Sequence, residues 1–180
     1  MLIDGCIFTT PDFGPAARFW REVTPRLGKL LGQPVYYLNR ATAPPPFTPG
    51  DSIMVLNAPP PDINDYAAEQ RRLAALCHEF STNLFASTRY TLAAPVPSVF
   101  VLADAFPFLG NIAYSSLLAR QSAIESAALC VTLSEQGSQY LASGYQVPPS
   151  RICQLAAGDP FADLDRLAGD FATALKQIAA

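Results

Sequence analysis

Polar side chains follow two strand-like runs in the middle of the sequence, and they are the residues best placed to contact a ligand. Residues 98–102 (SVFVL) form a β-branched and aromatic run too short for a buried helix, and Asp104 follows it. The preceding strand-like run, residues 83–90, ends with Thr88 and Arg89. Because ligands of open α/β sheets bind beyond the carboxyl ends of parallel strands, we expect these two ends to meet at a ligand cleft.

Two of these residues have more than one interpretation. Asp104 can accept a hydrogen bond from a bound hydroxyl group, or it can satisfy only backbone amides at the end of its strand. Arg89 can pair with Asp104, bind an anion such as phosphate, or form a surface ion pair of little energetic consequence. The sequence leaves these alternatives open.

Further candidate residues lie near predicted helix starts. Ser134 is a natural N-cap for a short helix, and Glu135 adds a favourable negative charge to its first turn. Arg18 belongs to a helix that also carries Arg21, Arg26 and Lys29. Such a basic helix suits an acidic lipid or partner surface, although a solvated face is its commoner meaning.

The cysteine and histidine pattern does not favour a metal site or a disulfide framework. The four cysteines, Cys6, Cys77, Cys130 and Cys153, are widely spaced and include no C-x-x-C pair. We therefore expect reduced, buried thiols. The single histidine, His78, lies near a predicted helix end, where we expect it to interact with the helix C-terminus and not with a metal ion. No metal is expected.

Length and composition indicate one globular domain. The chain has 180 residues, of which 50% are hydrophobic and 15% charged, and its formal net charge is −3. This balance makes nucleic acid an unexpected partner. The N-terminus has no basic segment, and no apolar stretch approaches the ~18 residues that span a bilayer. We expect a cytoplasmic protein without a transmembrane segment.

Strand-like and helical patterns alternate along the chain. This alternation predicts an α/β fold, a single doubly wound Rossmann-like domain with a mainly parallel sheet of about six or seven strands. We expect residues 1–160 to form this domain and residues 161–180 to form an amphipathic helix that packs on it. The strands are expected at residues 1–8, 33–40, 52–56, 83–90, 98–102, 129–133 and 151–155.

Several local patterns make narrower predictions. Trp20 should be in the core, and Pro25 should kink or interrupt the first helix. Asp62 or Asn64 can cap the second helix, on which Glu69 and its neighbours should stay largely solvated. Leu117, Leu118 and Ile124 are available to the core from the third helix, and Asp159 with Pro160 opens the last. These predictions can be checked residue by residue.

Five segments resemble a known family when taken together and in order. They are residues 14–22 (GPAARFWRE), 87–91 (STRYT), 97–108 (PSVFVLADAFPF), 126–135 and 147–158. The chain resembles the N-terminal, acceptor-side Rossmann-like domain of GT-B retaining glycosyltransferases of the group-1 or family-4 type. The third segment is similar to the family's Pro-Ser-Val-Phe-Met-Val-Tyr-Asp-Met-Ile-Pro-Glu. The resemblance covers about residues 1–161.

The resemblance implies a ligand site, and this chain departs from the family at several of its positions. It implies that Asp104 has a catalytic role in holding the acceptor, with Gly14, Arg18, Thr88 and Arg89 binding ligand. The remaining ligand-binding candidates on this basis are Ser134, Glu135 and Gly158. Pro15 removes one backbone donor from the family's glycine loop. Ala103 and Phe108 stand where the family often has His or Tyr and Glu.

Such enzymes bind the nucleotide-sugar mainly through a second domain, which these 180 residues do not supply. We therefore expect no cofactor, and a nucleotide-sugar donor only where a partner contributes the donor-binding domain. The expected partners are a second copy of the chain or such a protein, together with a glycan or sugar acceptor. The closing helix resembles the family's terminal helix, which crosses back onto the first domain.

Three functions remain. The chain is a glycosyltransferase-like subunit that supplies the acceptor side, a non-catalytic binding or assembly module on the same fold, or an unrelated small-molecule enzyme. The third is the weakest, because no Gly-x-Gly-x-x-Gly follows the first strand and no nucleophile-base pair is evident.

Overall fold

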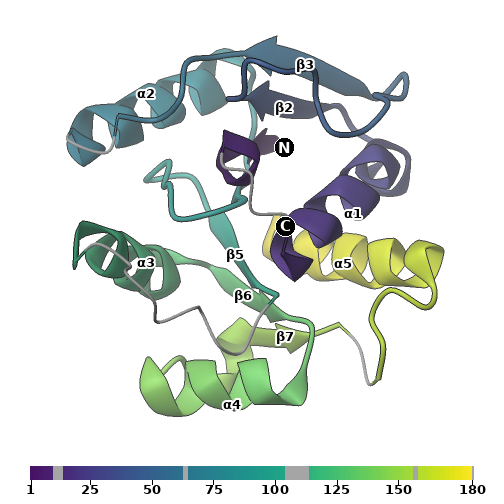
Figure 1. Ribbon diagram of the computed structural model, residues 1–180, viewed down its shortest axis with the longest axis vertical. Coiled ribbons are helices and arrows are strands. Elements are labelled where there is room, and N and C mark those ends of the chain that lie inside the picture. The colour runs from purple at the N-terminus through teal and green to yellow at the C-terminus, as the bar shows by residue number, and fades with distance from the viewer. Residues whose placement is uncertain (10–13, 63–64, 104–113, 156–157, 180) are drawn as a thin grey trace.

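Runs of β-branched and aromatic residues form seven parallel strands in the order β3-β2-β1-β4-β5-β6-β7. The computed structural model describes residues 1–180 apart from 10–13, 63–64, 104–113, 156–157 and 180 (Figure 1). The predicted α/β fold with one doubly wound parallel sheet is confirmed. The strands are β1 Leu2–Asp4, β2 Val35–Asn39, β3 Ile53–Asn57, β4 Phe85–Ser87, β5 Ser98–Leu102, β6 Leu129–Thr132 and β7 Ile152–Gln154.

Helices connect the strands and cover both faces of the sheet (Figure 1). On one face lie α1 (Pro15–Leu31) and α5 (Leu164–Ala179), and on the other lie α2 (Tyr66–Glu79), α3 (Tyr114–Ser126) and α4 (Glu135–Gly144). Two short 3-10 helices, η1 (Cys6–Thr9) and η2 (Pro149–Arg151), complete the connections. In the part of the chain that the structure describes, no helix is both long and apolar enough to cross a membrane.

Alternate side chains of each strand enter different cores, as the two-residue period of a strand requires. Ile3 and Val99 pack with the residues of α1 and α5. Leu2 and Phe85 pack toward α2, and Phe100 packs with residues of α3 and α4. Because both faces are covered, the strands read as nearly continuous apolar runs.

The strand order reverses between β1 and β4. The chain leaves β1 toward β2 on one side of the sheet and leaves β4 toward β5 on the other. Asp4, the last residue of β1, is in register with Ser87, the last residue of β4. Ligands of open α/β sheets bind beyond the strands at such a topological switch point. The expected adjacency of β4 and β5 is also confirmed, because Ser87 pairs with Phe100.

The last helix packs on α1, as its apolar stripe predicts. Phe171 of α5 is fully buried and meets Phe19 and Trp20 of α1 edge to face, with ring centroids 5.2 and 5.8 Å apart. Trp20 is completely buried, which confirms its prediction as a core residue. The closing helix is therefore part of the main core.

The predicted interruption of the first helix at Pro25 is wrong. The α1 helix continues through Pro25 from Pro15 to Leu31. Buried residues before and after the proline, Trp20 and Leu27 among them, hold both halves against the sheet. This packing outweighs the ~3 kcal/mol that an interior proline costs.

The caps of α2 and α5 also differ from the predictions. Asp65, directly before the first helical residue, accepts a hydrogen bond from Ala68 N at 2.9 Å, so neither Asp62 nor Asn64 is the cap. Similarly, α5 begins at Leu164, where Asp163 accepts from Arg166 N at 2.9 Å. An N-cap side chain reaches only the amides two or three residues ahead, which fixes its position.

The α3 helix buries less than its pattern predicts. Ile124 is fully buried, but Leu117 and Leu118 are 39% and 47% exposed. The core neighbours of α3 gather around its C-terminal half, at Ala123, Ile124 and Ala127. The helical period places Leu117 on the face of Ile124 but does not specify how far along the helix the core extends.

Candidate functional site

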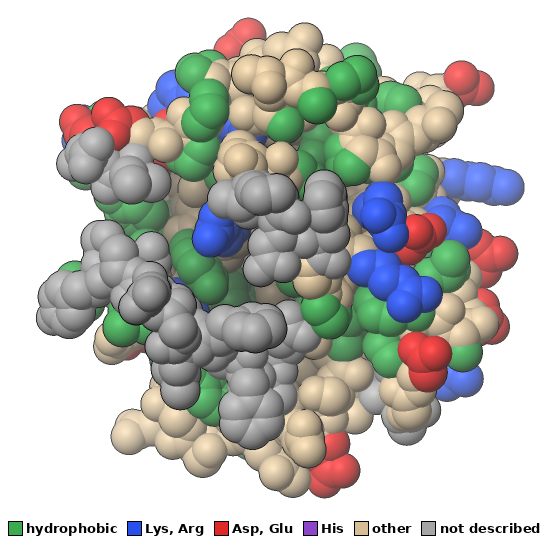
Figure 2. Space-filling model, in the orientation of Figure 1, with side chains coloured by type: hydrophobic (Ala, Val, Ile, Leu, Met, Phe, Trp, Pro, Cys, Tyr) green, Lys and Arg blue, Asp and Glu red, His purple; other side chains and the backbone are tan. Residues whose placement is uncertain are grey.

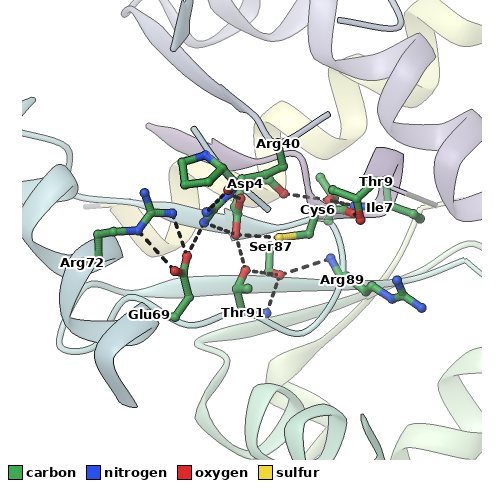
Figure 3. A network of polar contacts seen from close by, with 12 residues as sticks. Asp4, Cys6, Ile7, Thr9, Arg40, Glu69, Arg72, Ser87, Arg89 and Thr91 are labelled. Carbon is green, nitrogen blue, oxygen red and sulfur yellow. Dashed lines mark hydrogen bonds and ion pairs between the residues drawn. The ribbon is translucent and has the colours of Figure 1, made fainter. Parts of the chain in front are cut away.

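A buried group of charged and hydroxyl side chains lies at the switch point, and we call it the Asp4 network (Figure 3). Asp4 is completely buried. Its carboxylate accepts hydrogen bonds from Arg40 Nε at 2.6 Å, Arg40 Nη2 at 3.2 Å, Thr91 Oγ1 at 2.6 Å and Cys6 Sγ at 3.0 Å. These donors come from three different segments, so one carboxylate joins the ends of the central strands.

Arg40 follows β2 directly and is 1% exposed. All three nitrogens of its guanidinium donate hydrogen bonds, to Asp4, to Glu69 and to the Pro59 carbonyl at 3.0 Å. Glu69, in the first turn of α2, also pairs with Arg72 at 3.1 Å. A buried charge of this kind is tolerated only when it is paired and its donors are used. The network therefore attaches α2 to the ends of β1 and β2.

Hydroxyl groups complete the network on the β4 side. Thr88 Oγ1 donates to the Asp4 carbonyl at 2.7 Å and accepts from Ile7 N at 3.0 Å. Ser87 Oγ lies 2.9 Å from Thr91 Oγ1 and accepts from the amides of Arg89 and Thr91. Because Thr91 gives its single proton to Asp4, Ser87 is the donor between the two hydroxyls. These bonds hold the loops after β1 and β4 in place.

Burial and charge set the protonation of the network. Burial raises the pKa of Glu69, but the hydrogen bonds and charges of Arg72 and Arg40 outweigh it, so the pKa is lowered. Burial, with the Asp4 charge next, raises the pKa of the Cys6 thiol well above its usual value. Glu69 is therefore a stable anion and Cys6 a neutral thiol that donates a proton. Neither is poised to exchange protons near neutral pH.

Close packing at the end of β1 requires Gly5. A Cβ on this residue would lie 2.4 Å from the Tyr37 hydroxyl and 2.8 Å from the Leu38 carbonyl oxygen. Gly5 N donates to that same carbonyl at 3.0 Å, which turns the chain from β1 into η1. The absence of a side chain here lets the loop after β1 lie directly over β2.

The structure describes all of the predicted site residues except Asp104. Thr88 lies in the Asp4 network and is 5% exposed, whereas Arg89 is exposed and its side chain points away from the network (Figure 3). Gly14 is the residue before α1, and the exposed Arg18 in the first turn stacks on Phe161 with 4.2 Å from Cζ to the ring centroid. Asp104 lies outside the described residues.

The basic face of α1 is partly neutralised. Arg26 pairs with Asp165 of α5 at 2.9 Å, and Figure 2 shows acidic and basic side chains interspersed over α1 and α5. This arrangement agrees with a solvated face.

Ser134, Glu135 and Gly158 lie elsewhere along the same sheet edge, after β6 and β7. Ser134 Oγ caps α4 by accepting from Gly137 N at 3.1 Å. Glu135 is exposed and accepts from Gln139 Nε2 at 3.2 Å. Gly158 has a φ of 104°, a conformation that side chains disfavour. The structure does not bring these residues into the Asp4 network.

Sequence reasoning missed Asp4, Arg40 and Glu69, the charged centre of the site. Glu69 was predicted to be solvated, but it is 7% exposed because Arg40 and Arg72 both bind it. One signal was present, since Asp4 is a lone carboxylate inside an apolar strand and needs a buried partner. Arg40, which directly follows the neighbouring strand, supplies that partner.

The described residues contain no group of three or more His, Cys, Asp or Glu that could hold a metal ion. All four cysteines are free; Cys6, Cys77 and Cys130 are buried as expected, whereas Cys153 is only partly buried. Neither the known protein families nor the curated protein sequences include a match to this chain.

Proposed function

We propose that this chain is a glycosyltransferase-like domain that supplies the acceptor side of a sugar-transfer site and transfers no sugar by itself. The observation that carries the proposal is the saturated Asp4 network at the switch point. Its carboxylates and hydroxyls are used in holding the loops after β1 and β4. The Asp4 network can position a ligand, but its described residues include no free acid or base that could catalyse a transfer.

Sugar transfer from a nucleotide-sugar makes demands that this network does not meet. The leaving diphosphate needs charge compensation, the sugar must be oriented, and the acceptor must be held near the reacting carbon. Arg40, the cation nearest the centre of the network, is buried and already paired with two carboxylates. We therefore assign the diphosphate to a partner that binds the donor.

The outward-facing groups at the switch point suit the acceptor. Arg89 follows β4 and is exposed, and Arg18 is exposed in the first turn of the helix that follows β1. Asp104, after β5, is the proposed hydrogen-bond partner of an acceptor hydroxyl. Exposed arginines favour an acceptor that carries acidic groups as well as hydroxyls.

The test measures binding and turnover separately. Transfer and hydrolysis are assayed with a panel of labelled nucleotide-sugars. Binding of neutral and acidic sugars is measured by saturation-transfer NMR on the wild type, on Arg89→Met and on the control Lys29→Met. We expect no turnover, and acceptor signals that weaken about tenfold in Arg89→Met only, as for the loss of a charge-assisted hydrogen bond. Robust turnover by the chain alone, or equal signals in all three proteins, contradicts the proposal.

A second function, a non-catalytic assembly module on this fold, is favoured by one observation. Leu117 and Leu118 expose adjacent apolar side chains on α3. Light scattering of the purified chain separates the two functions, because this alternative predicts self-association that Leu118→Glu reduces. A monomer that still binds acceptor sugars leaves the first proposal in place.

A further inference from the structure

A second arginine is as deeply buried as Arg40 but is bonded very differently. Arg120 of α3 is 2% exposed. Its Nε, Nη1 and Nη2 atoms are buried, and none of them has a hydrogen-bond partner in the part of the chain that the structure describes. Arg40, by contrast, donates from all three nitrogens to two carboxylates and a carbonyl. Arg120 lacks the acceptors that normally make such burial tolerable.

The surroundings of Arg120 are aromatic. Its guanidinium carbon lies 5.5 Å from the ring centroid of Tyr140 and 5.7 Å from that of Tyr145. These two rings meet edge to face at 5.5 Å, and Tyr90, stacked on Phe100, packs against the same core between α3 and α4. Two cation–π contacts offset only part of the free-energy cost of burying a guanidinium.

The tyrosines add donors and no fixed negative charge. Burial, with Tyr140 next, raises the pKa of Tyr145, and the positive charge of Arg120 opposes this only in part. Its phenol therefore stays protonated at neutral pH and can donate a hydrogen bond. The loop that carries Tyr90 is held by Tyr66, whose hydroxyl donates to the Tyr90 carbonyl at 2.6 Å. A guanidinium beside neutral phenols therefore has no negative charge to compensate its own.

We propose that Arg120, with Tyr140 and Tyr145, forms a binding site for a small oxyanion, a phosphate group, between α3 and α4. The planar fork of a guanidinium matches two oxygens of a phosphate, and phenol hydroxyls can donate to the others. Tyr140 and Tyr145 are half-buried, so the aromatic part of the proposed site is partly exposed to solvent. It lies beside β5 and β6, apart from the Asp4 network, and does not depend on the proposed sugar-transfer role.

The test compares thermal unfolding in phosphate-free buffer and in inorganic phosphate for wild type, Arg120→Met and Arg166→Met. We expect ~10 mM phosphate, ten times a Kd of about 1 mM, to raise the wild-type Tm by about 3–6 °C. Arg166 is an exposed arginine of α5, so its variant should keep the full shift. Arg120→Met should lose the shift, and titration calorimetry should show heat only for the two proteins that retain Arg120.

Two outcomes overturn the proposal. The first is no phosphate shift in wild type, or an equal shift in Arg120→Met, which indicates a general salt effect. The second is that Asp104 is the counter-ion of Arg120. In that case Arg120→Met and Asp104→Asn would each lower the phosphate-free Tm, and the double variant would lower it no further. Our proposal instead predicts that Arg120→Met equals or exceeds the wild-type Tm without phosphate, because a lone buried charge is removed. Sulfate and acetate titrations distinguish a tetrahedral anion from a carboxylate.

Discussion

Asp4 is the residue on which the polar structure of the switch point depends. Four hydrogen bonds from three side chains reach its carboxylate, and its backbone carbonyl accepts from Thr88. The ion pair with Arg40 is completely buried on both sides. In such a pair the cost of desolvation and the gain of attraction nearly balance, so the loss of one partner costs more than the pair contributes.

We therefore expect Asp4→Asn to lower the free energy of unfolding by about 3–5 kcal/mol, because Arg40 keeps a buried charge with less compensation. The matched control is Arg72→Met, which removes the outer partner of Glu69. Its side chain is 37% exposed, so it should cost less than about 1 kcal/mol. Urea unfolding measures both. A cost for Asp4→Asn no greater than for Arg72→Met would show that the network does not hold the fold.

The sequence predicted part of this site. Thr88 was identified because a polar residue that follows an apolar run marks the end of a strand, whereas the side chain of Arg89 points away from the network. Asp4, Arg40 and Glu69 were not, because they lie 36 and 29 residues apart and meet only once β1, β2 and α2 are assembled. A charge on a helix is usually solvated, and nothing local to Glu69 indicates that Arg40 reaches it.

At the scale of elements, α1 and α5 form the principal helix pair of the core. Phe171 lies against Phe19 and Trp20, and all three side chains are fully buried. An isolated helix of this length is marginal in water, so this apolar contact is what keeps α5 folded. Its stripe was predictable because helical periodicity is a local property.

Phe171→Ala should therefore lower the free energy of unfolding by about 3–5 kcal/mol, through lost burial and the cavity left beside Trp20. Thr173→Ala, on the exposed side of α5, is the control and should change it by no more than about 0.5 kcal/mol. Thermal unfolding followed by circular dichroism compares them. Equal melting temperatures for the two variants would mean that α5 is held by something other than this contact.

Whether a segment is a helix or a strand was predicted better than where it begins and how much of it is buried. The continuation of α1 through Pro25 and the exposure of Leu117 depend on what packs beside each helix. By contrast, the Ser134 cap was predicted correctly, because it requires only a hydroxyl within reach of an amide three residues ahead. Local chemistry is visible in sequence, and the limits of a core are not.

For the whole molecule, alternating strands and helices were enough to predict a doubly wound sheet, because right-handed crossovers leave few topologies. The position of the order reversal was the less predictable feature. It depends on the side of β1 on which β4 inserts, and the register of Asp4 with Ser87 is a consequence of that insertion. Both faces of the sheet are buried, and the described core residues of α1 and α5 form one cluster with those of the strands.

This shared core predicts that residues 1–160 and 161–180 unfold as one unit. Trp20, the single tryptophan, lies at the α1–α5 contact, so its fluorescence reports the release of α5, whereas far-ultraviolet circular dichroism reports the whole chain. In urea, the two signals should give coincident transitions with one midpoint, as a cooperative domain requires. Removing α5 would expose Phe19 and Trp20 together, which is too much apolar surface for the remainder to stay stable alone. A fluorescence midpoint clearly below the circular dichroism midpoint would show instead that α5 detaches first and that the sheet holds without it.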